Sequence, residues 1–111
     1  MWIMVGGPYT SGARSDEDRQ YNLDVMNEAA LAVFEKGHVP IIGVNVALPM
    51  INVAGQSRFD EIMMPVSLAV ADRCDAFLRV GGQSAGADQE RDKFIARGLP
   101  VFDSLDEVPK A

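Results

Sequence analysis

Short, unbroken apolar runs alternate along the chain with longer stretches in which apolar residues recur at helical spacing. The first run, Trp2 to Val5, stops at Gly6-Gly7-Pro8, and a run without polar alternation is typical of a strand buried on both faces. Similar runs are Val39-Pro40-Ile41-Ile42, Ala76-Phe77-Leu78-Arg79-Val80 and Leu99-Pro100-Val101-Phe102. The pattern therefore predicts four buried strands.

Helical spacing and end signals predict a helix after the first strand. Ser15 precedes three acidic residues, and a hydroxyl cap with early carboxylates satisfies free N–H groups and suits the positive end of the helix dipole. Gly37 supplies the stop. The apolar positions at helical spacing are Met26, Ala29, Ala30, Val33 and Phe34.

Two more helices are predicted further along. One keeps an apolar face from Phe59 to about Arg73, although Pro65 must kink it or mark its true first turn. The other runs from Ala87 to Arg97. The stretch from Gly43 to Ser57 mixes Gly, Asn, Pro and aliphatic residues without a steady period, so we predict an irregular loop that covers the site and recognises the ligand.

Alternation of strand and helix over residues 1–111 predicts one α/β domain with an open, mostly parallel, flavodoxin-like (Rossmann-like) sheet and helices on both faces. Right-handed crossovers and the usual strand order 2-1-3-4 place strands one and three side by side, with the chain leaving them in opposite directions. Ligands bind at such a switch point. We therefore expect the loops Gly6 to Tyr9 and Gly81 to Glu90 to face each other across the site.

Composition excludes several classes of function. With a net charge of -6 and scattered Lys and Arg, the chain has no basic stripe for a nucleic-acid polymer. One cysteine, Cys74, and one histidine, His38, form neither a disulfide nor a zinc cluster, so no metal or cofactor is expected. The apolar start, Met1 to Val5, lacks a basic region and is too short for a signal peptide or membrane span. We expect a cytoplasmic protein without a membrane partner.

The candidate chemistry lies between Gly81 and Glu90. Three glycines there, Gly82 and Gly86 among them, let the backbone approach a ligand, and the free N–H groups of the next helix start favour an anion such as phosphate. Ser84 adds a hydroxyl donor. A plain strand-to-helix turn also needs a glycine or two, which is the alternative interpretation.

Glu90 falls within the first turn or so of that helix, where the dipole favours the ionised form. We therefore expect an ionised carboxylate at neutral pH. Such a carboxylate attacks a sugar C1 in retaining glycosyl transfer, and the covalent glycosyl-enzyme is resolved by water or an acceptor base. The alternative is an ordinary glutamate that complements the helix dipole.

Four segments, Gly6-Gly7-Pro8-Tyr9, Gly37-His38-Val39-Pro40, Cys74-Asp75-Ala76 and Gly82 to Glu90, together resemble the nucleoside 2-deoxyribosyltransferase superfamily. Within it they are most similar to a branch of small proteins related to the 2′-deoxynucleoside 5′-phosphate N-hydrolases. The resemblance implies cleavage or transfer at the N-glycosidic bond of a nucleoside or nucleoside 5′-monophosphate. It also implies that Glu90 is the nucleophile, that Ser84 helps to bind phosphate and that Tyr9 lies near the sugar.

One position departs from that family. Its members carry an aspartate on the helix before strand three, and counting back from Asp75 the matching residue is Ser67, which cannot act as an acid or base. Either Asp60 or Glu61 takes over, or a neighbouring subunit supplies the group, or the chain binds a ligand without cleaving it. A non-catalytic nucleotide or nucleotide-sugar binding module is therefore the second candidate function.

Other residues carry weaker signals. Arg58, at the start of the second predicted helix, is a candidate for contact with an anion, as are the backbones of Gly6 and Gly7. His38 and Asp75 begin strands at the far end of the sheet, so we expect structural roles. A more distant resemblance, to the phosphoribohydrolases that activate cytokinins, rests on two glycines and Glu90 alone. A small sheet with apolar helices often self-associates, and related enzymes are dimers or larger, so a homo-oligomer is expected.

Overall fold

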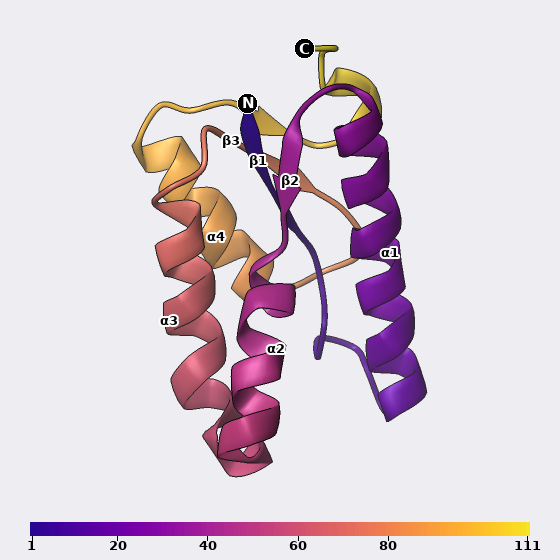
Figure 1. The fold of residues 1–111 in the computed structure, drawn as a ribbon, viewed down its shortest axis with the longest axis vertical. Helices are drawn as coiled ribbons and strands as arrows, with labels where there is room; N and C mark the ends of the chain where they lie inside the picture. Colours follow the sequence, from indigo (N-terminus) through magenta and orange to yellow (C-terminus); the bar gives the residue numbers. More distant parts are fainter.

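A four-stranded parallel sheet with helices on both faces forms the fold, described by a computed structural model of residues 1–111 (Figure 1). The strands are β1 (Trp2–Gly6), β2 (Val39–Ile41), β3 (Ala76–Arg79) and β4 (Val101–Phe102). The helices are α1 (Asp16–Glu35), α2 (Gly43–Ala54), α3 (Phe59–Ala71) and α4 (Ala85–Ala96), with short 3-10 turns η1 (Gln56–Arg58) and η2 (Leu105–Glu107). The predicted α/β class is confirmed.

The order of the strands is β2-β1-β3-β4, and all three neighbouring pairs are parallel, as predicted. In Figure 1, α1 lies on one side of the sheet, and α2, α3 and α4 lie on the other. The chain leaves β1 for α1 and leaves β3 for α4, in opposite directions. Because Gly6 pairs with Arg79, the carboxyl ends of β1 and β3 lie side by side, and the loops that follow them begin at the same edge.

The central strand explains how the sheet is held between the two helical layers. Ile3, Met4 and Val5 are completely buried, and successive side chains of a strand point to opposite faces. Ile3 and Val5 belong to the larger core cluster. Met4 joins the smaller cluster with Phe77 and Phe94, whose ring centroids lie 5.3 Å apart. The unbroken apolar run thus has the two-sided burial that the sequence predicts.

The prediction of an irregular loop from Gly43 to Ser57 is wrong, because residues Gly43–Ala54 form the helix α2. Val44, Ala47 and Ile51 are buried on one side of it, at helical spacing, against the core. Packing of this stripe overrides the poor helix propensity of glycine and of Pro49, which lies inside the helix. Gly43 also permits close packing of α2 on α3, since a Cβ there would lie 2.5 Å from Ser67 Oγ.

The other boundaries differ less from the prediction. Ser15 caps α1 as expected, its Oγ accepting a hydrogen bond from Asp18 N–H at 3.1 Å, but Phe34 is exposed rather than part of the buried face. Pro65 lies inside α3 and does not mark its first turn. Helix α4 begins at Ala85, two residues before its predicted start, because Ser84 is its N-cap. None of the helices is long and apolar enough to cross a membrane.

Candidate functional site

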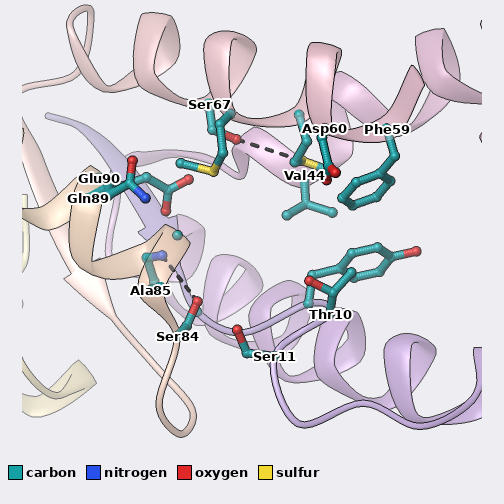
Figure 2. A pocket seen from close by; sticks show the side chains of 16 residues that line it. Thr10, Ser11, Val44, Phe59, Asp60, Ser67, Ser84, Ala85, Gln89 and Glu90 are labelled. Carbon is teal, nitrogen blue, oxygen red and sulfur yellow. Dashed lines mark hydrogen bonds between the residues drawn. The ribbon is translucent and has the colours of Figure 1, made fainter. Parts of the chain in front are cut away.

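A cleft of about 390 Å³ opens at the carboxyl end of the sheet (Figure 2). Both loops expected to meet there contribute to it, and one face of α3 forms its opposite wall. The lining residues are Gly7, Tyr9, Thr10 and Ser11 after β1; Val44 of α2; Phe59, Asp60, Met63, Met64 and Ser67 of α3; and Ser84, Ala85, Gly86, Ala87, Gln89 and Glu90 at the start of α4.

Glu90 is the buried acid of the cleft, with 6% of its surface exposed. It belongs to α4 and approaches the end of β1, where the absence of a side chain at Gly6 makes room for it. A Cβ at Gly6 would lie 2.6 Å from Glu90 Oε1 and 2.5 Å from Phe77 Cζ. Gly6 is therefore needed for space next to the glutamate rather than as a residue of the cleft lining.

Burial raises the pKa of Glu90 from its ordinary value of 4.5 to about 7. The Ser67 hydroxyl and the Arg79 guanidinium both favour the ionised form, and they offset only part of the desolvation cost. Glu90 is therefore about half protonated at neutral pH, in contrast to the expectation of a fully ionised carboxylate. The helix dipole is too weak here, because Glu90 lies beyond the first turn of α4, where its effect falls off.

Ser67 lies beside Glu90, at the position where the resemblance implies an aspartate. It is 1% exposed, and its hydroxyl also lies 3.9 Å from Met63 Sδ. Figure 2 places Ser67 on α3 at the same end of the cleft as Glu90. The serine hydroxyl can orient and partly stabilise the glutamate, and it cannot exchange a proton near neutral pH as a carboxyl group does.

Only one of the two substitute acids named from the sequence, Asp60, lines the cleft. Glu61 is exposed and bound to Arg58 by two hydrogen bonds of 2.9 and 3.0 Å, and this ion pair lowers the pKa of Glu61. Arg58 therefore has its own partner and does not contribute to the cleft lining. The structure places Glu90 and Ser67 at one end of the cleft and Asp60 at the other, and it leaves the Arg58–Glu61 pair outside the lining.

The predicted anion site at the start of α4 is built from polar neutral groups. Ser84 Oγ accepts a hydrogen bond from Ala87 N–H at 3.1 Å, so its own proton is free to donate to a ligand. Gly86 lines the cleft, and Gly82 lines an adjoining polar hollow. Arg79, whose guanidinium lies 3.6 Å from Asp88 in the first turn of α4, donates to the carbonyls of Val80 and Gly82, at 2.7 and 2.8 Å. No lysine or arginine lines the cleft.

Two aromatic rings line the end of the cleft that lies away from Glu90. Tyr9 and Phe59 have ring centroids 6.3 Å apart and planes only 12° from parallel. The sequence pattern singles out Tyr9, and assigns Phe59 only to the apolar face of a helix. The spacing of Asp60, Met63 and Ser67, at i, i+3 and i+7, is the signal that places them on the same face of α3.

The residues assigned structural roles lie at the other end of the sheet. His38 is buried between the amino group of Met1, 2.9 Å from Nδ1, and the carbonyl of Pro109, 2.6 Å from Nε2. Asp75 accepts a hydrogen bond of 2.8 Å from Trp2 N–H. Burial raises the pKa of the Cys74 thiol to about 11, so this cysteine is not a nucleophile at neutral pH.

Comparison of the chain with protein-family models, curated proteins and solved structures finds no match. Membership of the nucleoside 2-deoxyribosyltransferase superfamily thus stays a prediction from the sequence motifs. The function has to be argued from the geometry of the cleft and from its charges.

Proposed function

We propose that this protein cleaves the N-glycosidic bond of a nucleoside or nucleoside 5′-monophosphate, or transfers the sugar, with Glu90 as the nucleophile. The observation that carries the proposal is a buried glutamate at one end of a cleft whose other end is aromatic. A sugar is polar and a base is flat and apolar on its faces, so a nucleoside fits this division. The cleft volume of about 390 Å³ lies within the range typical of small-molecule sites.

In the first step a Glu90 carboxylate oxygen attacks C1′ of the sugar and forms a covalent ester. The bond from C1′ to the base nitrogen breaks, its electron pair leaves with the base, and the base takes up a proton from water in the open cleft. Water then attacks C1′, and the ester bond breaks with its electrons returning to Glu90. The attacking water releases a proton, which replaces the proton that the base took from water in the first step. The sum is nucleoside plus water giving free base plus sugar.

The neighbours of Glu90 support this role. Only the ionised form attacks, and the Ser67 hydroxyl and Arg79 both stabilise that form. Tyr9 lines the same cleft and pairs with Phe59 at the end that would take the base. Ser84, Gly86 and the start of α4 offer donors to a 5′-phosphate. No cation assists them, so phosphate binding at this site depends on neutral hydrogen bonds and on the helix dipole.

A non-catalytic binding module is the second candidate, favoured by the serine at position 67. Without a second carboxylate beside Glu90, no group there is suited to protonate the leaving base. In this alternative the protonated Glu90 donates a hydrogen bond to the ligand, as its pKa of about 7 permits at neutral pH.

Chromatographic detection of free base separates the two candidates. The protein and its Glu90→Gln variant are incubated with a panel of ribo- and deoxynucleosides and their 5′-monophosphates. We expect wild-type protein to release base at a rate that rises with pH through about 7, as Glu90 ionises. We expect Glu90→Gln, which keeps the shape but not the nucleophile, to release none. Saturable binding without release by the wild type would favour the binding module.

A further inference from the structure

Asp60 is an exposed carboxylate of the cleft lining with no cation bound to it. Glu61, the next residue, is neutralised by Arg58, and Arg79 reaches Asp88 at 3.6 Å. Asp60 makes no salt bridge, and its side chain lines the cleft. Figure 2 shows Asp60 beside Phe59, at the end of the cleft away from Glu90. An unpartnered carboxylate thus lies next to the aromatic pair.

The distance along α3 relates Asp60 to the site of bond cleavage. Ser67, beside Glu90, and Asp60 lie on one face of the helix, two turns and roughly 10 Å apart along its axis. With C1′ of a nucleoside at Glu90, the glycosidic bond directs the base along this wall toward Phe59 and Asp60. The ring planes of Tyr9 and Phe59 are nearly parallel and present aromatic faces to a flat ligand at that end. The edge of the base farthest from the sugar then meets Asp60.

A carboxylate can only accept hydrogen bonds, so Asp60 discriminates between base edges. Guanine presents two adjacent donors, N1–H and the 2-amino group, which match the two oxygens of a carboxylate. Adenine and cytosine present one amino donor next to a ring acceptor. Uracil and thymine present one N–H between two carbonyl oxygens, which a carboxylate repels. The edge chemistry therefore favours guanine.

We propose that Asp60, with the Tyr9–Phe59 pair, makes this a site for a 2-amino-6-oxopurine, that is, for guanine nucleosides. The proposal rests on the proposed function for the placement of the sugar at Glu90. It assigns base recognition to α3, whereas the sequence pattern assigns it to the segment from Gly43 to Ser57, of which only Val44 lines the cleft.

The test compares deoxyguanosine with deoxyinosine, which lacks only the 2-amino group. Kd for each is measured by calorimetry on the Glu90→Gln variant, which does not turn the ligand over, and kcat/KM for base release is measured on otherwise wild-type protein. We expect deoxyguanosine to be favoured roughly tenfold in both quantities, as for a bidentate base contact. Asp60→Asn, added to each background, should bring both ratios close to one. Asp92→Asn is the control, because Asp92 is exposed on α4 outside the cleft, and should leave them unchanged.

The outcomes separate the two proposals. Equal Kd values for the two nucleosides, or a guanine preference that persists in Asp60→Asn, overturn the role of Asp60 whether or not base is released. A guanine preference in Kd without base release by the wild type supports the role of Asp60 and contradicts the proposed cleavage. Base release with a preference for uridine or thymidine contradicts the role of Asp60 and leaves the cleavage proposal standing.

Discussion

At the scale of the residue, Glu90 shows how burial can outweigh a favourable helix position. Its place near the start of α4 is readable from the sequence, and the sequence therefore predicts an ionised carboxylate. Its burial is not readable, because it depends on contacts from β1 and α3 that are far away in the chain. Gly6 leaves room for its carboxyl group, and burial there raises the pKa of Glu90 to about 7, while the hydrogen bond from the Ser67 hydroxyl offsets part of that rise.

That raised pKa predicts a pH-dependent gain of stability for Glu90→Gln. Below pH 4.5 the carboxyl group is neutral in both the folded and the unfolded protein, and it carries no penalty. Between pH 4.5 and about 7 only the unfolded chain releases the proton, so stability falls as pH rises. Above that range the folded protein bears a cost of about 3 kcal/mol, from 1.36 kcal/mol per pKa unit. Glutamine avoids this cost.

We therefore expect Glu90→Gln to raise the free energy of unfolding at about pH 8.5 by up to about 3 kcal/mol and to leave it nearly unchanged at about pH 4. Urea denaturation of both proteins at the two pH values measures the difference. A variant that is less stable than the wild type at the higher pH would show that Glu90 is not desolvated as described.

At the scale of the element, helix-capping residues and apolar runs predicted the helices and strands correctly, whereas the helix propensity of single residues did not. The Ser15 cap with its acidic first turn correctly predicted the start of α1. The segment from Gly43 to Ala54 contains an apolar stripe that packs against the core, but its glycine, asparagine and proline residues led to the prediction of a loop. The helix exists because of that packing, which is a property of the tertiary structure and not of the segment alone.

The two serine caps allow the structural and binding roles of Ser84 to be separated. Ser84→Ala removes the acceptor for Ala87 N–H and should cost about 1 kcal/mol of stability. Ser15→Ala removes the same hydrogen bond from α1, away from the cleft, and is expected to cost a similar amount. Only Ser84→Ala should also raise KM for a 5′-monophosphate, because only Ser84 lines the cleft. Equal KM values in the two variants would argue against a ligand contact by Ser84.

At the scale of the whole molecule, the sheet and the place of the cleft follow from the order of the elements. Alternating strands and helices predicted the parallel 2-1-3-4 sheet, and this order alone brings the loops after β1 and β3 to the same edge. Single residues of α3 (Ser67, Asp60 and Glu61) were named from the sequence as site candidates, but the wall that Phe59, Met63 and Met64 complete was not predicted, because helical spacing identifies a shared face without showing what that face meets. The absence of a cation from the cleft lining was likewise not predicted, since Arg58, the expected anion contact, pairs with Glu61 outside the cleft.

If Glu90 is the nucleophile, a covalent glycosyl ester forms on its side chain, and this ester can be trapped. The protein is incubated with a deoxyguanosine analogue bearing fluorine at C2′ of an arabino-configured sugar, which slows hydrolysis of the glycosyl ester, and intact and peptide masses are then recorded. We predict one added fluorosugar, located on the peptide that contains Glu90 and absent from Glu90→Gln. Base release by the wild type with no adduct, or with an adduct on another residue, would contradict Glu90 as the nucleophile.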